Sequence, residues 1–280
     1  MRNSARPTSR EELRGFLKKA QSAGQSVFPC GQGSRLKRFL PKAKPDLWLS
    51  CSELKEILWV DPADQTCCVE AGLSLDALQK TLASFHLQLD VLDPNASSGS
   101  LGGLFMSRER SLTEKYSGPT RDQVLGASWM MADGSEIQSG ARVVKSVAGY
   151  DVTRLLLGSR GRLAICLDLT LRLRPIRPET HWVVAPKDAF ARTEHRDMQL
   201  EFAIPHPELP GWFCYRVQHP QTYAKAASAQ DAAVCEKALA TYLQEVSLGK
   251  HDTPLPEDSP WLLQIAEACA PGAPYFGERR

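Results

Sequence analysis

Three glycine-rich segments hold the residues whose types and spacing could bind an anion. The first, PCGQGSR over 29–35, adds a serine hydroxyl and an arginine to two glycines, and the second, SSGSLGGL over 97–104, precedes an expected helix start. Glycines let successive backbone amides turn toward one oxyanion, and a helix N-terminus supplies further N–H donors. Alone, the first loop fits a surface turn better, and the second fits a flexible linker equally well. Together they could meet on one diphosphate.

The third segment, GARVVKSVAGYDVTRLLLGSRGRLAI over 140–165, contains four glycines between short apolar runs. Its VVKSV stretch predicts an extended segment, and Tyr150 and Asp151 predict a helix start, where an acidic residue suits the helix dipole. Neither upstream loop contains the G-x-G-x-x-G pattern of a Rossmann dinucleotide site. The sequence therefore favours a phosphate cradle of another kind.

Groups for catalysis or metal binding are harder to find. The histidines do not stand at the i, i+2 or i, i+4 spacing of a metal pair, and the eight cysteines form no Cys-x-x-Cys pair. We expect exposed histidines, small buried thiols and no metal site. The histidines concerned are His181, His195, His206, His219 and His251.

The composition excludes several classes of protein. A formal charge of +2 gives no basic face for nucleic acid. Apolar runs have the length of strands, so no membrane span is predicted, and the N-terminus lacks the apolar region of a secretory signal. We expect a cytoplasmic protein that is peripheral to the inner membrane, if at all, through partners.

The elements that must position the loops follow from pattern and capping. Leucines over 163–173 alternate and are expected to point one way along a long strand. Asp133-Gly134 predicts a type I′ hairpin turn. The high proline content after residue 178 indicates a second unit with one strongly predicted helix. The predicted fold class is α+β. The remaining predicted elements are helices at 9–23, after Ser74, from Leu101 and at 228–246, and strands at 46–50, 57–62 and 66–72.

The order of these motifs resembles the flavin-binding domain of the vanillyl-alcohol-oxidase/p-cresol-methylhydroxylase (VAO/PCMH) superfamily. Within it, the likeness is greatest to the FAD-binding subunit of bacterial glycolate oxidases. The resemblance covers about residues 9–176 and rests on PCGQGSR, VDPADQTCCVEAGLSLDALQKTLA, GSLGGL and the run from SGPTRD to GRLAI. It implies a two-subdomain FAD-binding fold over 1–178, followed by a short α+β cap domain over 179–280.

The resemblance also implies roles for individual residues. Backbone amides of the first two loops would wrap the FAD pyrophosphate, and the 161–165 region would lie near the adenine. Ser34 stands where covalent-flavin relatives place a linking side chain, so non-covalent FAD is expected. The implied cofactor-binding residues are Gly31, Gln32, Gly33, Ser34, Arg35, Gly99, Ser100, Leu101, Gly102, Gly103, Gly118, Arg121, Asp122, Gly161 and Ile165.

Three functions remain open on the sequence. The first is an FAD-binding subunit of a glycolate-oxidase-like complex that acts on a 2-hydroxy acid, with a catalytic flavin subunit and an iron–sulfur subunit as partners. The second is a degenerate scaffold of the same fold, and the third is a stand-alone FAD-linked oxidoreductase. No catalytic residue is assigned, because no acid–base pair emerges from the pattern.

Overall fold

The fold was analysed in a computed structural model. The described residues are 3–36, 45–93, 95–107, 111, 113–114, 118–140, 151–176, 181–186, 200–205, 207–210, 212–217 and 229–247. Predictions that fall on VVKSV, Gly149 and Tyr150, and on four of the five histidines, therefore lie outside the described residues.

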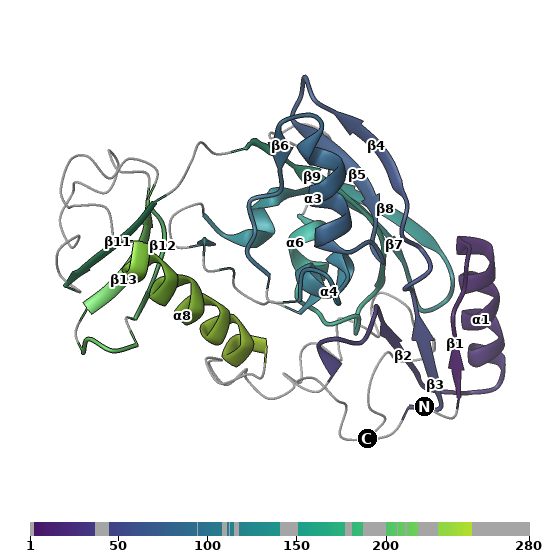
Figure 1. Cartoon of the computed structure of the whole chain (residues 1–280). Helices are drawn as coiled ribbons and strands as arrows, with labels where there is room; N and C mark the ends of the chain where they lie inside the picture. The colour runs from purple at the N-terminus through teal and green to yellow at the C-terminus, as the bar shows by residue number, and fades with distance from the viewer. Residues whose placement is uncertain are drawn as a thin grey trace.

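A five-stranded antiparallel sheet is the centre of the molecule (Figure 1). Its strand order is β4-β5-β9-β7-β8. The last of these strands in the sequence, β9, therefore lies between the earlier strands β5 and β7. Alternating and β-branched residues favour these strands. The strands are β4 (Ile57–Asp61), β5 (Thr66–Glu70), β7 (Val124–Met130), β8 (Glu136–Gly140) and β9 (Ile165–Arg172).

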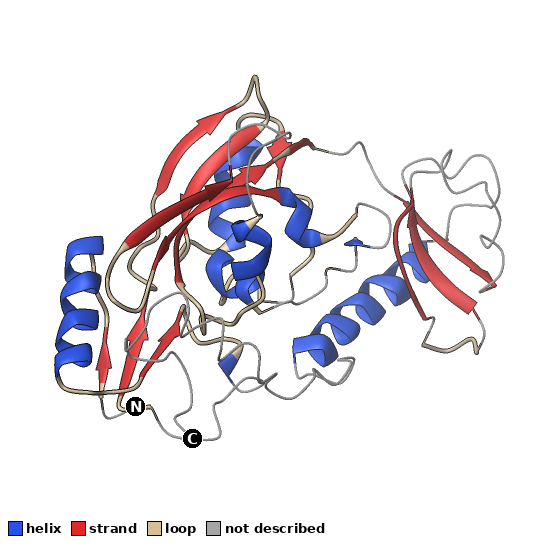
Figure 2. Cartoon of the chain, turned by 180° about the vertical axis from the view of Figure 1, so that it is seen from behind, coloured by secondary structure: helices blue, strands red, loops and turns tan. Residues whose placement is uncertain are grey.

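Three helices cover one face of this sheet, as Figures 1 and 2 show: α3 (Leu75–Ala83), α4 (Leu101–Met106) and α6 (Val152–Leu156). Their apolar side chains and those of the sheet form the larger hydrophobic core, with Trp129 fully buried. Each helix begins at a side-chain cap that satisfies an N-terminal amide. The caps are Ser74, Ser100 and Asp151.

A smaller sheet packs at the other side. Strands β1 (Ser4–Ala5), β3 (Leu47–Ser50) and β2 (Val27–Cys30) run parallel in the order β1-β3-β2. Helix α1 (Arg10–Ser22) is capped by Ser9, whose Oγ accepts from the Glu12 amide. Leu13 and Leu17 of α1 are fully buried in a second core that includes residues of β7 and β9. This arrangement sets the end of β2 against the large sheet.

The prediction that the leucines of 163–173 point one way is wrong. Ile165 and Leu167 pack in the core with α1, whereas Leu169 and Leu171 pack under the helices on the other face. The register of β7 with β9 shifts between Ser128 and Trp129. A bulge adds one residue to a strand and so reverses which side chains face which side. One strand therefore serves both cores.

The hairpin between β7 and β8 is confirmed, but its turn type is not. A type I′ turn needs positive φ at two central residues, and here only Gly134, at +83°, has it. The Gly134 amide donates to the Met131 carbonyl, and Met131 pairs with Ser135. The turn is thus a three-residue loop that closes on a left-handed glycine. The Asp133 carboxylate accepts from Ser135 and supports the turn from its side chain.

A C-terminal unit holds a three-stranded antiparallel sheet and the long helix predicted near 228–246. The strands β11 (His181–Pro186), β13 (Trp212–Val217) and β12 (Leu200–Pro205) lie in that order, and α8 (Ala229–Ser247) packs on them (Figure 1). Short pieces complete the fold, namely β6 (Leu87–Gln88) paired with β10 (Arg174–Pro175), and a 3-10 turn η1 (Thr120–Gln123). The division at 178/179 stays a prediction.

Candidate functional site

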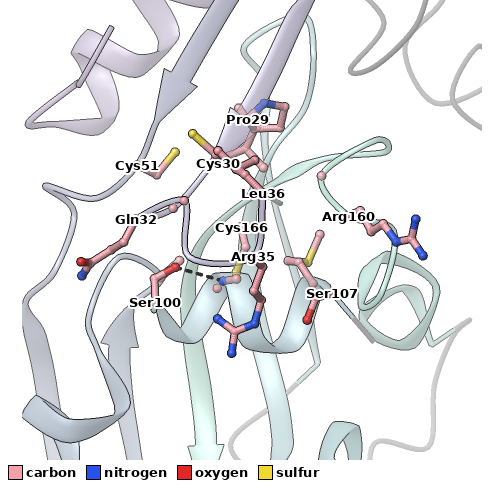
Figure 3. Close-up of a pocket in the computed structure, with 18 of the residues that line it drawn as sticks. Pro29, Cys30, Gln32, Arg35, Leu36, Cys51, Ser100, Ser107, Arg160 and Cys166 are labelled. Atoms are coloured by element: carbon pink, nitrogen blue, oxygen red, sulfur yellow. Dashed lines mark hydrogen bonds between the residues drawn. The ribbon is translucent and has the colours of Figure 1, made fainter. Parts of the chain in front are cut away.

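A pocket opens where the three glycine segments converge (Figure 3). Loop one, residues 31–36, follows the end of β2 and forms one wall. Ser100, Gly102 and Gly103, at the start of α4, form the second wall, and Arg160 and Gly161 form the third. Segments about seventy and sixty residues apart in the chain are thereby adjacent, as the sequence suggested for the first two.

Close backbone packing joins the first two walls. A Cβ built on Gly31 would lie 2.0 Å from Ser100 Oγ and 3.0 Å from Ser100 Cβ. Real Cβ atoms do not approach other atoms so closely, so loop one contacts the cap of α4 only because residue 31 has no side chain. Ser100 Oγ accepts a hydrogen bond from the Gly103 amide at 3.1 Å. The residue that caps α4 is therefore the one on which loop one rests.

The third wall is fixed in the same way. Gly161 has a φ of +74°, and a Cβ there would lie 2.7 Å from Pro29 Cγ. The amides of Gly158 and Arg160 donate to the carbonyls of Phe105 and Met106 at 3.2 and 3.0 Å, at the C-terminal end of α4. Helix α4 thus holds loop one at its beginning and the third wall at its end.

Loop one presents backbone donors. Among the described residues, the amides of Gly31, Gln32, Gly33 and Ser34 donate no hydrogen bond to another part of the chain. All four residues line the pocket, and Gly33 has a φ of +82°, which turns the chain back at this point. Successive amides in such a turn form a concave set of donors that suits phosphate oxygens. This is the geometry expected of a diphosphate cradle.

The second loop differs. The amides of Gly99, Leu101, Gly102 and Gly103 are all used inside the protein, and their acceptors are the Asn95, Leu73 and Ala71 carbonyls and Ser100 Oγ. The expectation that amides of both loops wrap one pyrophosphate therefore does not fit these four donors. Their glycines serve close packing instead, since a Cβ on Gly102 would lie 2.8 Å from Ala71 Cβ.

Arg35 is a charged residue of loop one that lines the pocket. Its Nη2 donates to Asp93 Oδ2 at 2.6 Å, and the two side chains are 8% and 2% exposed. A Cβ on Gly99 would meet Arg35 Nη1 at 2.6 Å. The guanidinium thus lies under the second loop, and its charge is balanced by Asp93. Arg160, by contrast, is directed away from Arg35 and Ser100 in Figure 3.

Comparison with known proteins indicates the family to which the first half of the chain is related. Residues 3–140 match the family described as FAD binding domain. These residues form an FAD-binding domain. An uncharacterized FAD-linked oxidoreductase of Mycobacterium tuberculosis is 31% identical over 183 residues, which are 65% of this chain and 40% of the relative. Glycolate oxidase subunit GlcE of Escherichia coli is 28% identical over 145 residues, 51% of this chain and 41% of the relative.

A solved structure supports the fold. An alkyldihydroxyacetonephosphate synthase structure superposes with a TM-score of 0.61 at 13% identity, covering 95% of this chain and 54% of that chain. At this identity the likeness speaks for the fold alone; together with the family match over residues 3–140, it confirms the predicted VAO/PCMH-type fold. The chain spans about 40% of the length of the curated relatives cited here.

The structure brings most of the expected cofactor-binding residues of the FAD-binding domain to one place. Gly99 and Leu101 lie behind the pocket wall, and Leu101 is fully buried. Gly118, Arg121 and Asp122 do not line this pocket. Arg121 and Asp122 are exposed on η1, where Arg154 pairs with Asp122 at 3.2 Å, and their contact with the cofactor stays a prediction. The predicted residues that line the pocket are Gly31, Gln32, Gly33, Ser34, Arg35, Ser100, Gly102, Gly103, Gly161 and Ile165.

Several lining residues of the FAD-binding domain were not predicted as such. Three are thiols, Cys30, Cys51 and Cys166, which the sequence predicts only as small buried residues. Burial raises the pKa of Cys51 to about 12, so its thiol is neutral at physiological pH. The only sequence signal was position, since Cys30 and Cys51 stand at the ends of short apolar strands. The other additions are Phe28, Pro29, Leu36, Ala71, Met106, Ser107 and Arg160.

Two further results concern the described residues only. None of the helices that the structure describes is long and apolar enough to cross a membrane. Within the same residues, no three His, Cys, Asp or Glu side chains gather as a metal site would require.

Proposed function

We propose that this chain is an FAD-binding subunit of a glycolate-oxidase-like flavoprotein complex that oxidises a 2-hydroxy acid. The observation that carries the proposal is loop one, whose residues 31–34 line the pocket with amides that donate no hydrogen bond among the described residues, in a domain of the FAD-binding family. The similarity to a glycolate oxidase subunit supports the substrate class. As an oxidoreductase, the chain would work with a catalytic flavin subunit and an iron–sulfur subunit in the cytoplasm.

The residues present fit the cofactor. The loop-one amides would hold the diphosphate, and the Ser100 cap and Gly161 would keep the walls at the separation that the cradle needs. Pro29 and the thiols give the pocket an otherwise apolar lining. Bound FAD supplies the electron-accepting ring. Ser34 stands where covalent-flavin relatives place a linking side chain, and loop one carries neither histidine nor cysteine, so the cofactor is expected to be held without a covalent bond.

The proposed partners are those that the similarity to a glycolate oxidase subunit suggests. No acid–base pair for removing a substrate proton lies at this pocket among the described residues, so the oxidation is assigned to the complex rather than to this chain alone. Electrons would then pass to the iron–sulfur subunit.

The first experiment measures flavin. The purified chain, expressed with riboflavin in excess, should absorb near the flavin bands and release FAD quantitatively on acid precipitation. Gly31→Ala should remove most of the flavin, whereas Gly15→Ala, in helix α1, should leave it unchanged. A colourless wild-type chain that binds no added FAD would contradict the proposal and favour the scaffold function.

A second experiment separates the subunit from a stand-alone enzyme. The chain alone should not reduce a dye with glycolate or D-lactate, and co-expression with the two partner subunits should restore the activity. Dye reduction by the isolated chain would instead identify it as a stand-alone FAD-linked oxidoreductase.

A further inference from the structure

Asp93 joins the cradle to a part of the molecule that the cradle does not touch. Each of its carboxylate oxygens accepts a different hydrogen bond: Oδ2 accepts from Arg35 at 2.6 Å and Oδ1 accepts from the Asn95 amide at 2.9 Å. The Arg35–Asp93 pair is almost fully buried. A buried ion pair of good geometry is costly to break from one side, because the remaining charge is left without a partner.

Arg35 lies under both walls. It lies in loop one, two residues after Gly33, and its Nη1 would be 2.6 Å from a Cβ on Gly99 and 3.5 Å from one on Gly103. A shift of the guanidinium would therefore move loop one and the start of α4 together. Because Asp93 balances its charge, Arg35 contributes position more than net positive charge.

The residue before Asp93 faces another neighbour. Leu92 packs against the hydrophobic cluster of the C-terminal unit, which contains Trp182, Ile204 and Cys214. Its amide donates to Ser111 Oγ at 2.8 Å, so its backbone is fixed as well. Adjacent residues thus contact the C-terminal unit and the arginine beneath the cradle.

We propose that Asp93 is a positioning residue for the FAD cradle and that Leu92 makes this positioning depend on the packing of the C-terminal unit. The inference rests on the proposed function only for the identity of the ligand. Packing of Leu92 fixes the 90–95 segment, Asp93 fixes Arg35, and Arg35 fixes the spacing of the two loops. Coupling between sites is reciprocal, so bound FAD also favours the docked C-terminal unit.

The first test uses the full chain and FAD titrations. Asp93→Asn and Arg35→Met should each weaken FAD binding by between about fivefold and 150-fold, the usual span of such coupling. The double variant Arg35→Met/Asp93→Asn should be no weaker than Arg35→Met, because both changes break one pair. If Arg35 were instead a direct phosphate ligand, Asp93→Asn would free its charge and tighten binding. That result would overturn the proposal.

The second test needs no cofactor. In the chain without FAD, Leu92→Ala should speed exchange of the hydrogen-bonded amides of Leu36, Gly99 and residues 101–103, while helix α1 keeps its wild-type protection. Leu58→Ala is the matched control, since Leu58 is 42% exposed on β4. Faster exchange confined to the C-terminal unit would refute the coupling even if FAD binds, and absence of FAD binding would leave this measurement intact.

Discussion

Loop one and the second loop are both glycine-rich segments at the beginning of a helix or after a strand, yet they do different work. Loop one carries amides with no acceptor among the described residues, whereas every glycine amide of 99–103 is bonded within the protein. Glycine serves loop one by leaving donors accessible in a left-handed turn at Gly33. It serves the second loop by removing side chains that would separate packed backbones. Similar composition therefore hides two structural roles: amides left without an acceptor in loop one, where we propose that FAD binds, and close backbone packing in the second loop.

Gly31→Ala should have the largest effect, because Gly31 is where the two loops touch. The added methyl group would lie 2.0 Å from Ser100 Oγ, so loop one must move away from α4. Overpacking of this kind costs about 1–3 kcal/mol. We expect FAD affinity to fall by about five- to 150-fold, equivalent to that energy, as measured by fluorescence titration.

A second substitution, at Ser100, should reverse the effect of Gly31→Ala. Gly31→Ala combined with Ser100→Gly removes the atoms that clash, and glycine costs a helix N-cap only a few tenths of a kcal/mol. The double variant should recover most of the affinity. Loss without recovery would show that Gly31 matters for a reason other than contact with the second loop.

Alkaline pH should lower the free energy of unfolding, because buried thiols are neutral in the folded state. Burial raises the pKa of Cys51 from 9.0 to about 12, and that of Cys67, in the larger core, to about 12 as well. A thiol whose pKa is raised in the folded state stabilises the fold fully below pH 9, and this contribution is lost as the pH rises from 9 toward 12. Each thiol should cost up to about 1.4 kcal/mol between pH 9 and 10.

The measurement is urea unfolding at pH 8, 9 and 10. Cys51→Ala and Cys67→Ala should each flatten the alkaline decline while lowering stability at pH 8. A decline that is unchanged in both variants would assign the alkaline effect to other groups.

Much of this fold follows from local chemistry. The caps at Ser9, Ser74 and Asp151 were predictable because a serine or aspartate before an apolar period can satisfy amides of its own helix. The convergence of the loops followed from a resemblance in motif order. A helix cap is encoded within a few neighbouring residues, and the order of motifs can be seen along the whole sequence.

Other features depend on partners distant in the chain. The Arg35–Asp93 pair joins residues 58 positions apart, and no local sequence pattern around either residue predicts the pairing. The amides of Leu101 and Gly102 looked available in sequence, but the carbonyls of Leu73 and Ala71 accept from them. The bulge opposite Ser128 likewise reversed a leucine pattern that read as a single face.

Ser100→Ala tests the supporting role of the second loop. Without the hydroxyl, the Gly103 amide loses its acceptor and α4 loses its N-cap, which costs about 1 kcal/mol. We expect a lower free energy of unfolding but a change in FAD affinity smaller than that of Gly31→Ala. An equal or greater loss of FAD affinity would show that Ser100 contacts the cofactor itself, and the contrast between the loops would weaken.

Gly15→Ala should have the smallest effect and the opposite sign. Gly15 lies within α1, and a Cβ there would meet nothing within 4 Å. Alanine replaces glycine in a helix interior with a gain of about 0.5–1 kcal/mol, since glycine loses more backbone entropy on folding. The melting temperature should rise by about 1–4 °C, with flavin content unchanged, in calorimetry beside the wild type. If Gly15→Ala were destabilising, open space around a glycine would not predict that alanine is tolerated there. The contacts of an added Cβ would then be no basis for the effect expected of Gly31→Ala.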